Sequence, residues 1–343
     1  MSLLDVHELS VAFPTSDGLV RAVRGMSFGV DAGQTLGIVG ESGSGKSVAA
    51  MALLGLSRGA TVSGSAVFAG TDLLSMAEPD LRAVRGARIA MVFQDPLSSL
   101  HPLYPIGWQI TETIRAHTAT GRRAARERAV DLLGMVGIAQ PRQRIDDYPH
   151  QFSGGMRQRV MIAMALALNP DIVVADEPTT ALDTTVQAQI LDLLRRLRSE
   201  LGMALIIITH DLGVIAQTAD EVLVMYAGRV AESAERRDLF YRSHHPYTLG
   251  LLASVPSAVG TGRLHPIAGQ PPSPIRLPPG CPFAPRCTYR MSRCAAEEPP
   301  LLPVAGGDGH RSACWLPADA VGSTAPAQQA RFAAVRDSGQ VTT

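Results

Sequence analysis

A short apolar strand, a glycine-rich turn and a helix follow one another without a gap between residues 35 and 56. The run Thr35–Val39 predicts a buried strand, and Val48–Leu56 has helical composition. Between them stands Gly40-Glu-Ser-Gly-Ser-Gly-Lys46-Ser47, whose glycines permit backbone conformations that other residues avoid. A strand that enters a helix through such a turn is typical of α/β folds with a mainly parallel sheet.

The rest of the first two thirds of the chain has the same rhythm. Further apolar runs at Ile89–Phe93, Ile172–Ala175 and Ala204–Thr209 predict three more strands, with longer amphipathic stretches between them. A polar, arginine-rich segment around Thr111–Gly137 interrupts this rhythm with apolar residues at helical spacing, which predicts a helical insertion. We therefore expect an α/β domain that carries an inserted helical part.

Charge and hydropathy exclude several classes of protein. Lys plus Arg and Asp plus Glu both total 31, so the chain lacks the basic field of nucleic-acid-binding proteins, and no nucleic-acid partner is expected. Apolar runs such as Ala204–Ile208 fall far short of the roughly 20 residues that a membrane-spanning helix needs. The N-terminus has no basic start and apolar core of a secretory signal, so we expect a cytoplasmic location.

The glycine-rich turn predicts a phosphate-binding site. Its spacing is that of a P-loop, in which Gly40, Gly43 and Gly45 let backbone N–H groups turn inward around phosphates. Lys46 is expected to reach the terminal phosphates, and the Ser47 hydroxyl to ligate Mg²⁺. The sequence thus predicts a nucleoside triphosphate site.

A pair of carboxylates ends the strand at Ile172–Ala175. The carboxyl ends of parallel strands are where such sheets place their chemistry. Asp176 can hold Mg²⁺, and Glu177 is suited to orient or deprotonate the water that attacks a γ-phosphate. An acidic pair at a strand end is more often a turn or helix cap, and the P-loop favours the catalytic interpretation here.

The segment Phe152-Ser153-Gly154-Gly155-Met156-Arg157-Gln158-Arg159 resembles the signature motif of ABC ATPases. The family's other motifs follow in the same order: a Q-loop at Gln94, a D-loop at Ala181-Leu182-Asp183 and a switch histidine at His210. The resemblance implies a P-loop NTPase cassette with a RecA-like core, an N-terminal antiparallel β-subdomain and a helical subdomain. Phe152 and Met156 depart from the commonest signature, which has Leu and Gln there.

The resemblance also implies the roles of individual residues. Catalysis falls to Glu177, His210 and Gln94, and Mg²⁺ to Ser47, Gln94 and Asp176. The ATP site comprises Phe13, Gly40, Ser42, Gly43, Gly45, Lys46, Ser47, Gln94, Asp176 and Asp183. Ser153, Gly154 and Gly155 are expected to bind the ATP of a partner subunit through a helix N-terminus. Phe13 follows the first expected strand, where it could stack on adenine or simply belong to the core.

The chain's end resembles the C-terminal extension of dipeptide and oligopeptide transporter ATPases, through His245-Pro-Tyr-Thr-Leu-Gly-Leu-Leu-Ala-Ser-Val-Pro256. Four cysteines follow at positions 281, 287, 294 and 314, and similar tails are associated with a 4Fe-4S cluster. Structural zinc sites usually have tighter ligand pairs, so Cys281, Cys287, Cys294 and Cys314 favour Fe–S over Zn²⁺, with free thiols a third option. His310 is expected to be a solvated loop residue rather than a ligand.

These observations lead to one functional prediction. The chain resembles the ATP-hydrolysing subunit of an ABC importer for dipeptides and oligopeptides, with nickel or glutathione as alternative cargo. It would work at the cytoplasmic face of a bacterial plasma membrane with a second homologous ATPase subunit, two transmembrane permease subunits and an extracytoplasmic peptide-binding protein. A soluble ABC protein and a non-enzymatic Fe–S scaffold are the alternatives from other classes.

The expected organisation has three parts. Residues 1–240 form the nucleotide-binding domain, with the helical insertion at about 97–165. Residues 241–318 form the cysteine-bearing extension, in which a Pro-rich stretch from Pro266 to Pro285 excludes long helices and central strands. Residues 319–343 are small and polar, which predicts a disordered tail.

Overall fold

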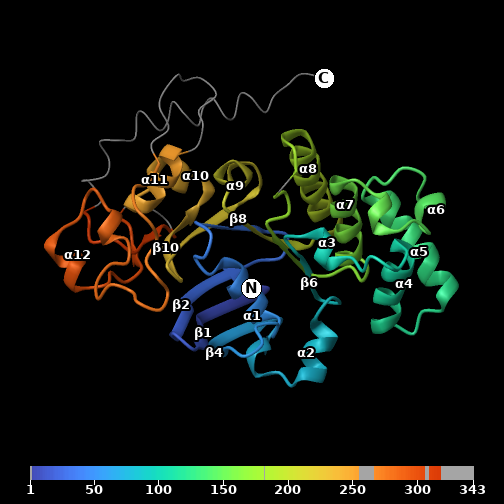
Figure 1. Cartoon of the computed structure of the whole chain (residues 1–343), viewed down its shortest axis with the longest axis horizontal. Coiled ribbons are helices and arrows are strands. Elements are labelled where there is room, and N and C mark those ends of the chain that lie inside the picture. Colours follow the sequence, from blue (N-terminus) through green and yellow to red (C-terminus); the bar gives the residue numbers. More distant parts are fainter. Residues whose placement is uncertain (1, 181, 255–265, 306–308, 318–343) are drawn as a thin grey trace. The chain divides into compact units, whose positions relative to one another are not determined.

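The computed structural model describes residues 2–180, 182–254, 266–305 and 309–317. The chain divides into two compact units, each made of separate stretches (Figure 1). The first unit comprises Met1–Leu4, Val30–Thr35 and Phe68–Ile208, and the second comprises Asp5–Gly29, Leu36–Val67 and Thr209–Thr343.

The first unit contains three parallel strands: β6 (Ile89–Val92), β7 (Ile172–Asp176) and β8 (Ala204–Thr209). β7 lies between the other two, with Ile172 opposite both Ile89 and Ala204. Every residue of β7 and β8 is buried, which explains their uninterrupted apolar runs, because strands covered on both faces do not alternate. The strands predicted from these runs are confirmed, with β6 one residue shorter and β7 one longer.

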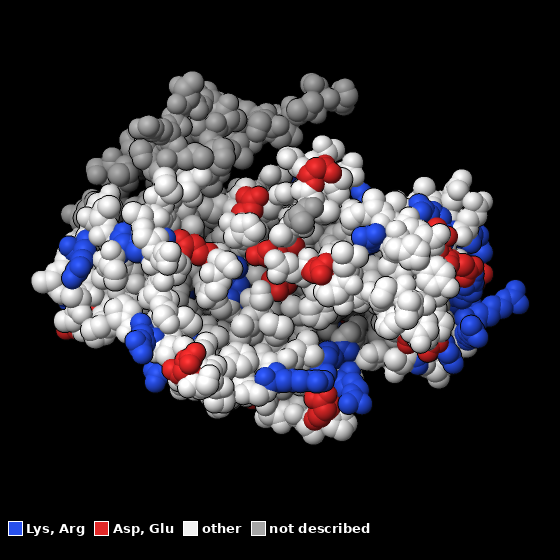
Figure 2. Space-filling model, in the orientation of Figure 1, with Lys and Arg blue, Asp and Glu red and all other residues white. Residues whose placement is uncertain are grey.

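Helices make up most of the rest of the first unit. The segment predicted to be helical forms α4 (Ile106–His117) and α5 (Arg122–Met135), which pack against each other and against α7 (Gly154–Ala165). Of the remaining helices of this unit, α8 (Thr184–Leu201) is long. The others are short: η1 (Leu73–Ser75), α2 (Glu78–Val84), α3 (Pro96–Ser99), α6 (Pro141–Arg144) and η2 (Pro149–Gln151). Where Figure 1 labels α5 and α6, Figure 2 shows a gathering of basic side chains with acidic ones among them. In this part of the chain Arg126 pairs with Asp146 and Arg142 pairs with Glu127.

The second unit holds two groups of strands. In one, β2 (Gly18–Val30), β1 (Leu4–Thr15) and β4 (Thr61–Phe68) are neighbours in that order. In the other, β3 (Thr35–Val39) pairs in parallel with β9 (Glu221–Tyr226), and β9 pairs antiparallel with β10 (Arg229–Glu235). Two-residue strands from the chain's end, β12 (Arg311–Ser312) and β11 (Leu302–Pro303), extend this second group beyond β10.

Short helices and loops complete the second unit. After β3 comes α1 (Lys46–Leu53), and later come α9 (Leu212–Thr218), α10 (Arg236–Arg242), α11 (Pro246–Ser254) and α12 (Ser292–Ala296). As the prolines predict, the described part of 266–285 has no secondary structure beyond the start of a 3-10 turn, η3 (Ala284–Arg286). The tail predicted to be disordered lies outside the described residues. In the part of the chain that is described, no helix combines the length and apolarity needed to span a bilayer.

Candidate functional site

The glycine-rich turn after β3 has the shape that its sequence predicts. Gly43 and Gly45 take positive φ angles of 78° and 102°, which favour glycine, and α1 begins at the next residue. A Cβ atom at Gly40 would lie 2.2 Å from the Met225 carbonyl oxygen, and one at Gly45 would lie 2.2 Å from that of Ala22. The turn is therefore pressed against its neighbours and admits no side chain at these two glycines.

Lys46 is the first residue of α1 and is buried. Its Nζ donates to the carbonyl oxygens of Gly40 (2.8 Å) and Glu41 (2.9 Å), so the ammonium group lies inside the curve of the turn. Ser47 follows at the second position of the helix and Ser42 is exposed at the top of the turn. A helix N-terminus with a lysine beside it is a suitable site for phosphate.

Glu177 follows β7 in the first unit and is fixed by two side chains. Its Oε2 accepts hydrogen bonds from Gln94 Nε2 (2.8 Å) and from Thr180 Oγ1 (2.8 Å). Its backbone has a φ of 46°, which is unfavourable for a residue with a side chain, and its N–H donates to Ile208 O (2.8 Å). The sequence predicted Gln94 and Glu177 in one site, and the structure brings them together. Thr180 was missed, because nothing in its neighbourhood distinguishes it from other turn residues.

Asp176 is the last residue of β7 and is buried. The sequence placed it one residue beyond its strand, and the strand instead includes it. A carboxylate at the carboxyl end of a central parallel strand can serve as a magnesium ligand.

The signature segment forms the start of α7 in the first unit. Ser153 is the N-cap, and its Oγ accepts from the Met156 N–H (3.4 Å). A Cβ at Gly155 would lie 2.5 Å from Val186 Cγ1, so this glycine permits close packing against the start of α8. Ser153 and Gly154 are exposed, as an anion site requires.

The predicted D-loop residue Asp183 caps α8: its carboxylate accepts from the Val186 N–H (2.9 Å). Ala181 of the same motif lies outside the described residues. His210 follows β8 in the second unit and is exposed.

Phe13 lies inside β1 and is half-buried, so the prediction that it follows the first strand is wrong. The strand continues to Thr15 because β1 and β2 are long and are joined by a short turn.

All four cysteines are free thiols that line one cavity of about 20 Å³, although they are far apart in the sequence. Burial raises the pKa of Cys281 and Cys287, and it raises that of Cys314 to about 12. Among the described residues, no three Cys, His, Asp or Glu side chains are grouped closely enough to hold a metal ion. The donor chemistry suits a metal and the thiols converge, but their arrangement is not that of a ligand set.

His310 is not the solvated loop residue that the sequence predicts. It is 2% exposed, and its Nε2 lies 2.8 Å from Oε1 of Glu232, which is fully buried on β10. The Glu232 carboxylate also accepts the backbone N–H groups of His244 and His245 (3.1 Å to His245). Strand β12 brings His310 to this carboxylate by pairing with β10, a long-range contact that the local sequence does not reveal.

Comparison with known proteins gives the family. A model described as "ABC transporter" matches residues 23–180, and one described as "Oligopeptide/dipeptide transporter, C-terminal region" matches residues 231–294. The dipeptide transport ATP-binding protein DppD of Bacillus subtilis is 48% identical over 318 residues, which are 92% of this chain and 94% of that protein. The chain belongs to the family of oligopeptide and dipeptide transport ATP-binding proteins.

Other members of this family differ in length from the chain. The oligopeptide transport ATP-binding protein OppD of Mycobacterium tuberculosis is 54% identical over 317 residues, which are 91% of this chain but 51% of that protein. The chain thus spans about half the length of this mycobacterial relative. DppD of Escherichia coli is 47% identical over 325 residues, which are 99% of that protein.

Solved structures support the predicted fold. A dimeric post-hydrolysis state of the ATP-binding cassette MJ0796, bound to ADP and Pi, matches with a TM-score of 0.62 and 27% identity. The match covers 68% of this chain and 99% of that one. The prediction of an ABC cassette with a P-loop NTPase fold is confirmed.

Proposed function

We propose that this chain binds and hydrolyses ATP to drive the uptake of dipeptides or oligopeptides across a membrane. One observation carries the hydrolytic part: Glu177 is held by Gln94 at 2.8 Å at the end of β7, in a chain that also has a well-formed P-loop. A fixed carboxylate of this kind can orient the water that attacks a γ-phosphate.

The P-loop residues would bind the nucleotide. Backbone N–H groups of the turn, with Gly40, Ser42, Gly43 and Gly45, would surround the phosphates, and Lys46 would neutralise them. Ser47 and Asp176 are the proposed Mg²⁺ ligands, with Gln94 sensing the ion and the attacking water. His210 is proposed to contact the γ-phosphate and Phe13 to stack on adenine, both on the strength of the family's motif order.

The signature segment supports a second ATPase subunit. Ser153 and Gly154 are exposed at the N-terminus of α7, which suits an anion supplied by another chain. The related cassette MJ0796 was solved as a dimer. We propose a homologous partner whose ATP is contacted by Ser153, Gly154 and Gly155, with Asp183 close to the same interface.

Two membrane permease subunits and an extracytoplasmic peptide-binding protein are the other proposed partners, at the cytoplasmic face of a bacterial plasma membrane. Large apolar side chains that are exposed shortly before and within α4 support a docking site for the permeases. They are Phe93, Leu97, Leu103, Tyr104 and Trp108. Tyr104 and Trp108 stack at 4.1 Å, and exposed aromatic pairs of this kind favour protein interfaces.

Peptide cargo rests on the match of residues 231–294 to the C-terminal region of oligopeptide and dipeptide transporters. Nickel and glutathione are the alternative cargoes. We also propose that residues 1–240 form a nucleotide-binding domain with a helical insertion at about 97–165. Residues 241–318 would form the extension, and residues 319–343 the tail.

We further propose that the extension binds a 4Fe-4S cluster, with Zn²⁺ as the alternative. The ligands would be Cys281, Cys287, Cys294 and Cys314. The support for this proposal is the convergence of all four thiols on one cavity. Binding would require the thiols to draw together, and anaerobic purification with iron, zinc and sulfide analysis tests it. About four irons and four sulfides per chain would support the cluster, and a metal-free protein would refute it.

The hydrolytic proposal is tested by Glu177→Gln, which keeps the shape of the side chain and removes its charge. The variant should bind MgATP as tightly as the parent and hydrolyse it at least about a hundredfold more slowly. Glu200→Gln, an exposed change near the end of α8, is the control and should keep the parent's rate. Unchanged turnover in Glu177→Gln would remove the proposed role.

A further inference from the structure

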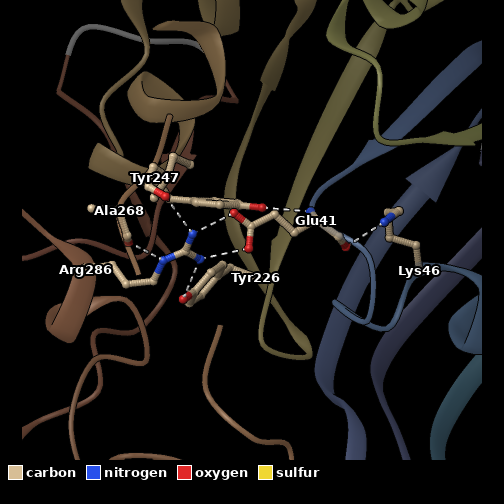
Figure 3. Close-up of polar contacts among 7 residues, drawn as sticks. Glu41, Lys46, Tyr226, Tyr247, Ala268 and Arg286 are labelled. Atoms are coloured by element: carbon tan, nitrogen blue, oxygen red, sulfur yellow. Dashed lines mark hydrogen bonds and ion pairs between the residues drawn. The ribbon is translucent and has the colours of Figure 1, made fainter. Parts of the chain in front are cut away.

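The C-terminal extension contacts the P-loop at Glu41, the residue that follows the first glycine of the turn. The guanidinium of Arg286 binds the Glu41 carboxylate with two nearly parallel hydrogen bonds, Nη1 to Oε2 at 2.8 Å and Nη2 to Oε1 at 3.0 Å (Figure 3). The Arg286 side chain is 5% exposed and that of Glu41 is 25% exposed. A bidentate pair with so little access to water is stronger and more directional than a surface ion pair.

Arg286 is itself held in place. Its Nε donates to Ala268 O (3.0 Å), and its Nη1 also donates to the hydroxyl of Tyr226 (3.3 Å). The centre of the Tyr226 ring lies 5.8 Å from Arg286 Cζ. Burial disfavours the charged guanidinium, but the bonds to Glu41 and Tyr226 outweigh it and raise the pKa of Arg286 above its ordinary value. The side chain is thus a fixed cation built into the extension.

The backbone of Glu41 is fixed as well. Its N–H donates to the hydroxyl of Tyr247 on α11 (2.8 Å), a side chain with no exposed surface. Its carbonyl oxygen accepts from Lys46 Nζ (2.9 Å), so Glu41 lies between Arg286 and the lysine of the P-loop (Figure 3). One residue therefore links the extension to the group that is proposed to meet the phosphates.

The pair of Arg286 and Glu41 also affects the charge of the P-loop. The Glu41 carboxylate belongs to a turn proposed to surround a polyanion, and an uncompensated negative charge there would repel the phosphates. Arg286 compensates the charge, and it also holds the turn in the conformation that keeps the Glu41 carbonyl directed at Lys46. Since preorganisation of a loop improves binding more than it changes a later chemical step, the effect should fall on affinity.

We propose that Arg286 is a positioning residue for nucleotide binding, which acts through Glu41 to neutralise and pre-order the P-loop. The inference rests on the proposed function, since it assumes that the P-loop binds ATP. It assigns to the cysteine-bearing extension an effect on the affinity for ATP.

The test compares the KM for MgATP, kcat and the Kd for Mg²⁺ and a non-hydrolysable ATP analogue in variants of the full chain. Arg286→Ala removes the bidentate pair with Glu41, and Arg286→Lys keeps the positive charge without the bidentate geometry. Glu41→Gln removes the negative charge of the pair. Arg293→Ala is the matched control, because this arginine lies in the same extension but pairs with Glu297, the residue that follows its own short helix.

Arg286→Ala should raise the KM and the Kd about tenfold while kcat stays within about twofold, and Arg286→Lys should recover part of the loss. In the Glu41→Gln background the same Arg286→Ala change should alter the KM by less than about threefold, because the two residues act as one unit. Arg293→Ala should match the parent.

Three results would overturn the inference. The first is a parent that binds ATP normally together with an Arg286→Ala variant of unchanged KM and Kd. The second is an equal loss in the parental and Glu41→Gln backgrounds, which would mean that Arg286 does not act through Glu41 and that the extension has simply been damaged. The third is a parent that fails to bind ATP at all, which would remove the proposed function as well and is thereby distinguished from the first two.

Discussion

Replacing Glu232 by Gln should destabilise the chain strongly, although the two side chains have nearly the same shape. Glu232 has no exposed surface, and its carboxylate accepts from the backbone N–H groups of His244 and His245 and contacts Nε2 of His310. Hydrogen bonds to a charged group contribute about 1.5–3 kcal/mol each. The Gln amide keeps one acceptor oxygen but turns an NH₂ group towards a backbone N–H, so at least one buried donor loses its partner.

We therefore expect a loss of about 3 kcal/mol in the free energy of unfolding, which corresponds to a fall of roughly 6–12 °C in the melting midpoint. Thermal denaturation followed by circular dichroism measures it. Glu235→Gln is the control, because Glu235 ends the same strand in an exposed position. A midpoint for Glu232→Gln within about 2 °C of the parent, equal to that of the control, would refute the view that this carboxylate joins β10 to the extension.

Three further changes have defined outcomes. Gly40→Ala should abolish measurable binding of MgATP in a titration, because the new Cβ would overlap the Met225 carbonyl at 2.2 Å, and binding at the parental Kd would contradict the described turn. Gly155→Val should lower ATPase activity of the assembled ATPase pair at least about tenfold by forcing α7 away from Val186, whereas unchanged activity would argue against this packing. Burial lowers the pKa of His245 from 6.5 to about 4, so the folded state binds fewer protons than the unfolded state between these pH values. The stability that comes from keeping His245 neutral is therefore complete above pH 6.5. It declines by up to about 3 kcal/mol as the pH falls to 4. His245→Asn should flatten that slope in urea titrations at several pH values, and an equally steep slope would assign it to other groups.

Most of the cassette could be predicted because its evidence is local in sequence. The P-loop glycines stand between a strand and a helix, so the chain itself brings Gly45 and Lys46 together. The strands of the first unit are buried on both faces, and their continuous apolar runs identify them without any knowledge of their neighbours. Gln94 and Glu177 were paired through the motif order, and their hydrogen bond agrees with it.

The parts that could not be predicted depend on contacts between distant segments. Arg286 and Glu41 are 245 positions apart, and neither residue belongs to a pattern that indicates the other. His310 was expected to be a solvated loop residue, yet β12, which pairs with β10, brings it to a buried carboxylate. Phe13 was placed after its strand, although the turn residues Ser16 and Asp17 directly follow the true end of β1 at Thr15.

The most direct test of the whole account is the ATPase rate of the chain assembled with its proposed partners in lipid vesicles, measured with and without a peptide-loaded binding protein. We predict that loaded binding protein raises hydrolysis severalfold and that Glu177→Gln abolishes both the basal and the stimulated rate. An ATPase rate that does not change with peptide-loaded binding protein would contradict peptide import. Full activity of Glu177→Gln would contradict the proposed catalytic role of Glu177.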